Sequence, residues 1–555
     1  MFSHFLRKLR LISPTASGAS VVCAGDRRWH LAPGAEQFFG HTAPDPERWI
    51  ADGLAEVVKS GPHRTVYRVT LPAGVVYMKH CRISGFRAWA REVLRPPKAR
   101  LEFENALALN ARRIAAVVPL AWAERDSRWP GESYLITRAS DGVPFIQFAQ
   151  RTLPILSPAA ETGVRRLLAR TLGRFLADLH DAGVAHPDPH AGNLLVELPA
   201  SRVPRFSLID LHAVRVGRPL TWAESRANLV LYNRWFQLAA CRADRLRFWH
   251  AYRAARRTLG LGPSHALDVE RDTSASNLGF WASRESRCVG RNRYFRRLTG
   301  TFRGFAVADL PQEFLAELLA DPDAAFAKPT TGILKDSRSS TVAELVMPTA
   351  DGPRSAILKR FNVRRRHEPL KNLLRRSPAL RSWITGHSLR DRWLPSPRPL
   401  AVFHRIRSGC PAEGYLLTEK VPDAIDLREE ITRPGVLEKL ARTVRAMHDR
   451  GVSHRDLKAP NVLLERGEVP VLIDLVGVQT RVRVSFTQRA KELARLNASF
   501  LKSPDVRHAD RLRFLRAYLA AGPRRPEGWK SWWVAIGGAT AAKVAKNRQS
   551  GRPLA

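Results

Sequence analysis

Two loops in the sequence carry residues whose types and spacing suit phosphoryl transfer. The loop HRDLKAPN places Asp456 where a carboxylate could orient or deprotonate an attacking hydroxyl, and Asn461 follows five residues later. Phosphoryl transfer also needs hard oxygen ligands for Mg²⁺ and a cation on the phosphates. Asp474, at the end of the next apolar strand, offers a second metal ligand beside Asn461. Lys359 on an upstream strand would contact the nucleotide phosphates, and Lys458 could neutralise the transferred group.

The first half of the chain has the same layout. The loop HPDPHAGN contains Asp188 and Asn193, Asp210 ends a following strand, and Lys79 lies upstream. His190 stands where the other loop has a lysine. An H-x-D-x₄-N loop followed 13 or 17 residues later by such an aspartate, with an upstream strand lysine, is a specific signal for an ATP-dependent kinase. The alternative is that the loop aspartates only cap or brace a turn.

The chain compared with itself indicates a tandem duplication. The segment RADRLRFWHAYRAA returns after 266 residues as HADRLRFLRAYLAA, and the two upstream lysines are 280 residues apart. Several blocks in the same order with nearly constant offsets mark a repeat. We therefore predict a first domain over residues 1–305 and a second over residues 306–555, opened by a short helix in DLPQEFLAELLADPDAAF.

Each copy alternates between two kinds of pattern. Residues 60–80 form two β-rich runs broken by Gly and Pro, which predicts a hairpin. Helical spacing of apolar residues follows from residue 99, and a long amphipathic helix over residues 163–182 stops at Gly183. The predicted fold class is α+β: two tandem protein-kinase-like bilobal domains, each with a small β-rich lobe and a larger helical lobe.

A kinase lysine is usually held by a glutamate on a helix. The first copy offers Glu104, with Glu102 as the alternative, on the predicted helix downstream of Lys79. The aligned stretch of the second copy, SWITGH, has no acid, and the nearest one is Glu368. Lys359 is therefore expected to be held differently, or the second copy to be less active.

The loop over the nucleotide phosphates is poor in glycine in both copies. The first copy has only Gly61 at the turn. The second has KDSRSSTVAE, where Ser339, Ser340 and backbone amides would have to contact the phosphates.

The chain is long and strongly basic. Its 555 residues carry Lys+Arg 91 against Asp+Glu 51, a formal charge of +40, which favours anionic partners. The basic residues are spread along the chain and no nucleic-acid motif is present, so nucleic acid is an unlikely partner. The five cysteines form no CxxC pair, which argues against a structural zinc site and against a disulfide framework.

The first residues could form a basic amphipathic helix that lies on an anionic membrane surface, or an ordinary helix end that packs on the domain. Its apolar side has the spacing of a helix: Phe2, Phe5, Leu6, Leu9 and Ile12. Nothing in the chain reaches the ~20 apolar residues of a spanning helix. The sequence therefore predicts a soluble, cytoplasmic protein that could be peripheral on a membrane.

The stretches HRDLKAPNVLL, HPDPHAGNLLV and ADRLRFLRAYL, with the short LID strands, resemble the lipopolysaccharide kinase (Kdo/WaaP) family, bacterial relatives of protein kinases. The first loop also resembles that of UbiB-like atypical kinases. The family resemblance implies transfer of the γ-phosphate of ATP, with Mg²⁺, to a sugar hydroxyl (Kdo or heptose) of the lipopolysaccharide core. It also implies an anionic glycolipid or sugar acceptor, met at the inner face of the inner membrane.

Two other functions stay open at this point. A bacterial Ser/Thr-type protein kinase would use the same HRDLKxxN form, although no APE-like end of an activation segment follows Asp474. A scaffold in which one or both copies are pseudokinases is the other alternative. The sequence leaves undecided which copy is active, which acceptor is used and which oligomeric state the protein adopts.

Overall fold

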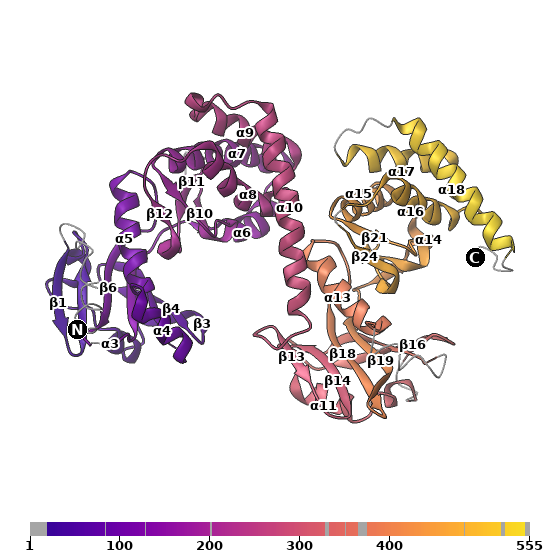
Figure 1. Ribbon diagram of the computed structural model, residues 1–555, viewed down its shortest axis with the longest axis horizontal. Helices are drawn as coiled ribbons and strands as arrows, with labels where there is room; N and C mark the ends of the chain where they lie inside the picture. The colour runs from indigo at the N-terminus through magenta and orange to yellow at the C-terminus, as the bar shows by residue number, and fades with distance from the viewer. Residues whose placement is uncertain are drawn as a thin grey trace. The chain divides into compact units, whose positions relative to one another are not determined.

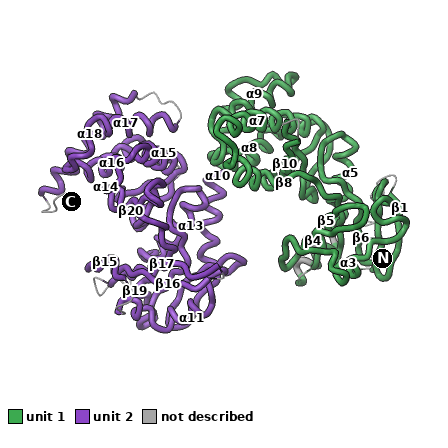
Figure 2. Tube along the Cα trace, turned by 180° about the vertical axis from the view of Figure 1, so that it is seen from behind, with its two compact units in different colours: residues 1–276 green, residues 277–555 purple. Residues whose placement is uncertain are grey.

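The computed structural model describes residues 19–83, 85–127, 129–199, 203–327, 332–349, 351–363, 375–481, 483–522 and 528–549. The chain divides into two compact units, residues 1–276 and 277–555, shown in separate colours in Figure 2. The division falls inside helix α10 (Pro263–Arg287). The amphipathic segment predicted over residues 2–12 lies outside the described residues.

Each unit begins with a seven-stranded antiparallel sheet, and the strand order is the same in both. In the first unit the order is β1-β2-β6-β7-β5-β4-β3, and in the second it is β13-β14-β18-β19-β17-β16-β15. The strands of the first sheet are β1 Ser20–Ala24, β2 Arg27–Leu31, β3 Ala55–Gly61, β4 Arg64–Leu71, β5 Gly74–Cys81, β6 Pro119–Arg125 and β7 Ser133–Arg138. Those of the second are β13 Phe295–Leu298, β14 Phe302–Val307, β15 Ile333–Ser337, β16 Ser340–Met347, β17 Arg354–Phe361, β18 Pro399–Arg407 and β19 Cys410–Glu419.

A helical lobe with two small sheets follows each large sheet (Figure 1). The short strands are β8 Val143–Pro144, β9 Val184–Ala185, β10 Leu194–Glu197, β11 Arg205–Leu208 and β12 Arg215–Val216, then β20 Ala424–Asp426, β21 Val452–His454, β22 Val462–Glu465, β23 Val469–Leu472 and β24 Val478–Thr480. The other helices of the first unit are α2 Glu36–Phe39, α3 Pro46–Ala51, α4 Phe86–Leu94, α5 Lys98–Ala111, α6 Phe145–Gln147, α7 Pro158–Asp181, α8 Trp222–Ala239 and α9 Arg242–Ala255. Those of the second are α11 Gln312–Ala320, α13 Pro378–Asp391, α14 Leu427–Glu430, α15 Val436–Asp449, α16 Phe486–Ala498, α17 His508–Ala520 and α18 Trp529–Gln549.

This architecture is two tandem protein-kinase-like domains, so the predicted fold class is confirmed. The predicted hairpin corresponds to β4 and β5, and the two predicted helices to α5 and α7. Separate hydrophobic cores fill the sheet-rich and the helical lobe of each unit.

The structure places the junction of the two copies upstream of the predicted boundary. A cut between residues 305 and 306 would pass through β14, which pairs with β18 in the second sheet. The last turn of α10 and the residue that follows it also contact α13 and its C-cap residue in the second unit. Trp383 Nε1 donates to the carbonyl of Cys288 at 2.8 Å, and Arg392 pairs with Glu285 at 3.0 Å. These strands gave no match in the internal repeat, which is why the sequence misplaced the boundary.

The part of the chain that the structure describes contains no helix with the length and hydrophobicity to traverse a lipid bilayer.

A glycine with a left-handed backbone ends the long helix before each H-x-D-x₄-N loop. Gly183 follows α7 and Gly451 follows α15, both at φ 74°. A Cβ on Gly451 would also collide with the carbonyl oxygen of Arg481, whose N–H bonds to the carbonyl of Gly451 at 2.6 Å. The space between helix and loop is therefore too small for any side chain at this turn.

We expect Gly451→Ala to destabilise the second unit by about 2–5 kcal/mol, because it adds a steric collision to the ordinary cost of a left-handed alanine. Gly435→Ala is the matched control, since Gly435 also has a positive φ but open space around its Cβ position. The control should lose only about 1–2 kcal/mol. Urea unfolding of the purified variants measures both, and equal losses would show that the collision is relieved.

Candidate active sites

The strand lysine of the first unit is held by a glutamate on helix α5. Lys79 Nζ lies 2.5 Å from Glu102 Oε1, and the Glu102 side chain is only 5% exposed. The prediction of Glu104 was wrong and its alternative correct: Glu104 lies on another side of α5 and pairs with Arg100 at 2.7 Å. Residues two apart on a helix point about 200° apart, so only one of the two can face β5.

The strand lysine of the second unit has a different partner. Lys359 Nζ lies 2.9 Å from Asp474 Oδ1. The 280-residue offset between the two lysines brings Ser382 of α13 to the position of Glu102. Ser382 is buried and donates to the carbonyl of Pro378 at 2.9 Å. Lys359 is thus held differently, as the sequence predicts, while Glu368 lies outside the described residues.

Asp210 follows strand β11 and Asp474 follows strand β23. Both aspartates have a left-handed backbone, with φ 61° at Asp210 and 53° at Asp474. His212 Nδ1 donates to Asp210 at 3.0 Å, and Arg64 lies 3.5 Å away. The hydrogen bond from His212 and the charges of Lys79 and Arg64 hold the pKa of Asp210 far below its usual range despite burial.

For Asp474, burial raises the pKa, but the charge and hydrogen bond of Lys359 outweigh it and leave the pKa lowered. Both aspartates are therefore ionised at neutral pH.

The two H-x-D-x₄-N loops share one hydrogen-bonding pattern. The Asn193 amide donates to the carbonyl of Asp188 at 3.1 Å, and the Asn461 amide donates to the carbonyl of Asp456 at 2.8 Å. The loop aspartates are exposed, as a base that meets a substrate must be. In the second unit Lys458 Nζ pairs with Asp456 at 3.0 Å.

His190, at the corresponding position of the first unit, turns its ring back into its own loop and accepts from the N–H of Gly192 at 3.0 Å. The two loops therefore differ in the cation available beside the base.

A buried histidine holds each loop from below. His186 Nδ1 and His454 Nδ1 accept from the N–H groups of Asp188 and Asp456, at 3.2 and 3.3 Å. Burial lowers the pKa of both rings, so they stay neutral. Each ring therefore braces its loop through this hydrogen bond.

The residues predicted as metal ligands lie beside each other in both units. The N–H of Ile209 donates to the carbonyl of Asn193 and that of Ile473 to the carbonyl of Asn461, each at 3.0 Å. The asparagine amide nitrogens are used within the loops, which leaves the amide oxygens as ligands. Amide and carboxylate oxygens suit Mg²⁺.

A second group of ligand atoms occurs in the first unit, where atoms of Glu102, Asp210 and His212 lie within 4.8 Å of one another. Lys79 already neutralises Glu102 there, so this cluster suits the ammonium group better than a further cation.

A polar cavity of about 800 Å³ brings the predicted nucleotide-binding residues of the second unit together. Ser339, Ser340, Lys359 and Asp474 all line it. Ser340 is buried and its N–H donates to Ser337 Oγ at 3.3 Å, so the hydroxyl of Ser339 is the more accessible of the two. In the first unit Gly61 ends β3 and pairs with Arg64 across the corresponding turn.

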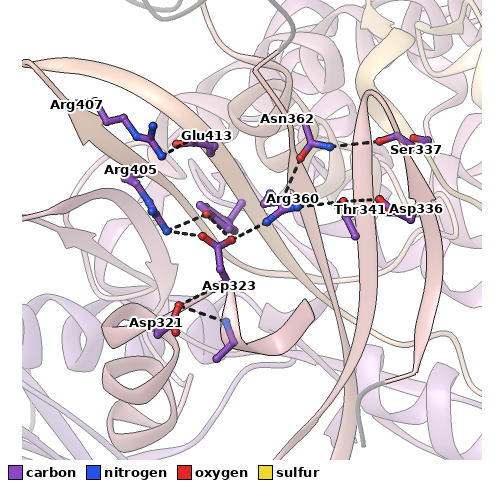
Figure 3. A network of polar contacts seen from close by, with 12 residues as sticks. Asp321, Asp323, Asp336, Ser337, Thr341, Arg360, Asn362, Arg405, Arg407 and Glu413 are labelled. Carbon is purple, nitrogen blue, oxygen red and sulfur yellow. Dashed lines mark hydrogen bonds and ion pairs between the residues drawn. The ribbon is translucent and has the colours of Figure 1, made fainter. Parts of the chain in front are cut away.

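Arg360, the residue after Lys359 on β17, belongs to a partly buried polar network (Figure 3). Asp323 accepts from Arg360 at 3.0 Å, from the hydroxyl of Tyr415 at 2.9 Å and from Arg405 at 2.5 Å. These donors come from β17, β19 and β18. The network therefore fixes three neighbouring strands to the turn after α11 and keeps Lys359 directed at the cleft.

Sequence reasoning missed three residues of these sites. His212 and Arg64 orient Asp210, and Glu492 supports the loop of the second unit from helix α16. Glu492 accepts from His448 at 3.0 Å, from Ser453 at 2.5 Å and from the N–H of His454 at 2.9 Å. The histidine in LIDLH was a visible signal, whereas Glu492 lies outside any motif.

Comparison with protein families finds one matching model, described as the lipopolysaccharide kinase (Kdo/WaaP) family, over residues 75–252 and 362–518. Each unit thus carries one matched segment, and each segment contains the H-x-D-x₄-N loop.

The chain is also similar to the 3-deoxy-D-manno-octulosonic acid kinases of Photobacterium profundum and Vibrio cholerae. It is 37% identical to the first over 116 residues and 35% identical to the second over 119 residues. These alignments cover 20% of this chain and 48% and 49% of the relatives, so they span about half the length of each relative. Among solved structures, "WaaP in complex with acyl carrier protein" is 20% identical with a TM-score of 0.33, over 45% of this chain and 98% of that chain.

The stability of the second unit should fall in acid because of Glu492. Burial raises the pKa of Glu492, but hydrogen bonds from His448, Ser453 and Gln488 bring it from 4.5 down to about 2. A carboxylate with a lowered pKa stabilises the fold fully above pH 4.5, and this contribution is lost as the pH falls toward 2. The wild-type free energy of unfolding should therefore fall more steeply below pH 4.5 than that of Glu492→Gln, by up to about 1.4 kcal/mol per pH unit.

Glu429→Gln, on the exposed side of α14, is the control and should keep the wild-type pH dependence. Denaturant titrations from pH 3 to 7 give both slopes. Parallel wild-type and Glu492→Gln curves would contradict the assignment of an ionised, buried Glu492.

Proposed function

Because the chain belongs to the lipopolysaccharide kinase (Kdo/WaaP) family, whose model matches it in both units, we propose that it transfers the γ-phosphoryl group of ATP to a sugar hydroxyl of the lipopolysaccharide core, on Kdo or heptose. The observation that carries the proposal is the cluster of Lys79, Glu102 and Asp210 next to a loop with an exposed Asp188. A positioned lysine, an ionised aspartate and a loop carboxylate are the parts that a kinase-type transfer requires.

In the proposed reaction Asp188 accepts the proton of the acceptor hydroxyl as its oxygen bonds to the γ-phosphorus. The bond from the γ-phosphorus to the bridging oxygen breaks, and ADP leaves with that oxygen. Lys79, held by Glu102, balances negative charge on the nucleotide phosphates. Asn193 and Asp210 would hold Mg²⁺, which supplies further positive charge to the phosphates when bound.

We assign turnover to the first unit. Its lysine is held by a glutamate outside the metal-ligand set, so Lys79 need not pair with Asp210, whose contacts are with His212 and Arg64. In the second unit Lys359 and Asp474 neutralise each other at 2.9 Å. Binding MgATP there must break that pair, with no glutamate at the Ser382 position to hold the lysine afterwards.

A second candidate function applies to the second unit alone: a pseudokinase that binds nucleotide or sugar without turning it over. The Lys359–Asp474 pair and the missing glutamate support it. The complete HRDLK loop, in which Lys458 pairs with Asp456, supports catalysis instead.

The acceptor is proposed to be an anionic glycolipid. The formal charge of +40 supports an enzyme that approaches such a substrate, by raising its local concentration electrostatically. Such an acceptor would place the protein at the inner face of the inner membrane, as a peripheral and otherwise cytoplasmic protein.

Replacing the proposed base tests both the reaction and the copy that performs it. Asp188→Asn should lower transfer of ³²P from γ-labelled ATP to purified lipopolysaccharide core by about 10²–10⁴-fold. Asp456→Asn should stay within about twofold of wild type, since turnover is assigned to the first unit. Loss in Asp456→Asn alone would move the reaction to the second unit. Unchanged transfer in both single variants and the double variant would refute the catalytic assignment.

The partner of Lys79 can be tested with two neighbouring glutamates. Glu102→Gln removes a charge-assisted hydrogen bond worth about 1.5–3 kcal/mol, so kcat/KM for ATP should fall at least tenfold. Glu104→Gln changes the same residue type on the same helix and should leave kcat/KM within twofold. Equal effects of the two substitutions would mean that Lys79 needs no fixed partner.

A further inference from the structure

The second unit contains a mostly apolar groove in its helical lobe, separate from the cleft that holds Lys359. Its volume is about 600 Å³, and it lies between α16, α17 and α18. Six of its apolar lining residues are Leu493, Leu496, Phe500, Phe514, Trp533 and Ile536. Along α18 the lining runs from Trp533 to Arg548, about 22 Å at the rise of an α-helix. The groove is therefore long as well as apolar.

The same place in the first unit is filled by a polar network around Glu270. Arg245 Nε donates to Glu270 Oε1 at 2.9 Å. Gln237 donates to Glu270 Oε2 at 3.2 Å and to Ser274 Oγ at 2.9 Å. Asn233 donates to Glu270 at 3.3 Å. These contacts join α8, α9 and α10 through polar side chains.

Matching hydrogen bonds align the two places residue by residue. Asn233 donates to Thr273 Oγ1 in the first unit, and Asn497 donates to Thr540 Oγ1 in the second, both at 3.1 Å. Counting from these pairs, Gly537 stands at the position of Glu270. Leu501 and Ala541 replace Gln237 and Ser274 in the same way, so the network has been exchanged for an apolar groove.

One member of the network, Arg511, is only partly satisfied: its Nη2 donates to the carbonyl of Phe500 at 3.0 Å. Arg511 occupies the place of Arg245 in the repeated ADRLRF segment and lines the groove. Its Nε is buried and has no hydrogen-bond partner among the residues that the structure describes. The neighbouring Asp510 is engaged by Arg513 and by the N–H of Arg507. A buried guanidinium nitrogen without an acceptor is costly, which points to an acceptor supplied by a ligand.

We propose that this groove binds a long-chain fatty acid, with its carboxylate on Arg511 and its alkyl chain along α18. The carboxylate replaces the one that Glu270 provides in the first unit, and the chain covers the apolar lining. Arg548 and His508 also line the groove and complement an anionic ligand. The second unit thus carries a lipid site in addition to its nucleotide cleft.

Binding of palmitate to the purified full-length chain tests the proposal, measured by isothermal titration below the palmitate micelle concentration. Palmitate should bind with one site per chain, and hexadecan-1-ol, which lacks the carboxylate, at least tenfold more weakly. Gly537→Glu restores the carboxylate of the first unit, and a side chain at this position meets open space. This variant should lower palmitate affinity at least tenfold and raise Tm. Arg511→Gln should reduce palmitate affinity to that of the alcohol.

Gly538→Glu is the matched control, because it adds the same side chain at the next residue of the helix. Gly538 also has open space at its Cβ position, but it does not line the groove. It should keep palmitate affinity within twofold of wild type. The proposal is overturned if palmitate does not bind, if Gly537→Glu and Gly538→Glu bind it equally, or if the alcohol binds as tightly as the acid. Binding confined to phosphatidylglycerol vesicles would also overturn it, in favour of a bilayer lipid.

Discussion

The contact between a buried strand ammonium and one carboxylate decides how each cleft is arranged. Lys79 and Lys359 are only 17% and 20% exposed, and a lysine this far from water needs a nearby negative charge. In the first unit Glu102 provides that charge from helix α5. In the second unit helix α13 provides no carboxylate, and Lys359 forms an ion pair with Asp474 across the cleft. The same ammonium is therefore paired either with a helix glutamate or with the aspartate across the cleft.

The loops below this contact have changed much less. Both use a neutral, buried histidine to hold the N–H of the loop aspartate, and both place the asparagine carbonyl against the strand before the second aspartate. Backbone hydrogen bonds make most of this geometry, so it tolerates different side chains around it. Lys458 in one loop and His190 in the other leave the loop shape intact but change the charge beside the loop aspartate.

The sequence could predict the parts that lie within one motif. Residues of the H-x-D-x₄-N loops are neighbours in the chain, so their spacing alone brings Asp456 and Asn461 together. The lysine partner depends instead on which side of a helix faces the sheet. Glu102 and Glu104 flank the buried Phe103, and only tertiary packing separates them. The first two strands of each sheet were not predicted, because their sequences do not match between the two copies. The predicted domain boundary therefore fell inside the second sheet.

The two units differ most where a carboxylate of the first has no counterpart in the second. Ser382 replaces Glu102 in the cleft, and Gly537 replaces Glu270 in the helical lobe, while Lys359 and Arg511 keep their positive charges. The outcomes differ because the side chains differ. Lysine carries its charge at the end of a flexible four-carbon chain and can reach Asp474. The Nε of arginine is part of a planar group near the backbone, so Arg511 cannot turn it to a distant acceptor. Loss of the helix carboxylate in the cleft therefore lets the lysine form an ion pair with Asp474. Loss of the carboxylate in the helical lobe leaves Arg511 Nε without an acceptor.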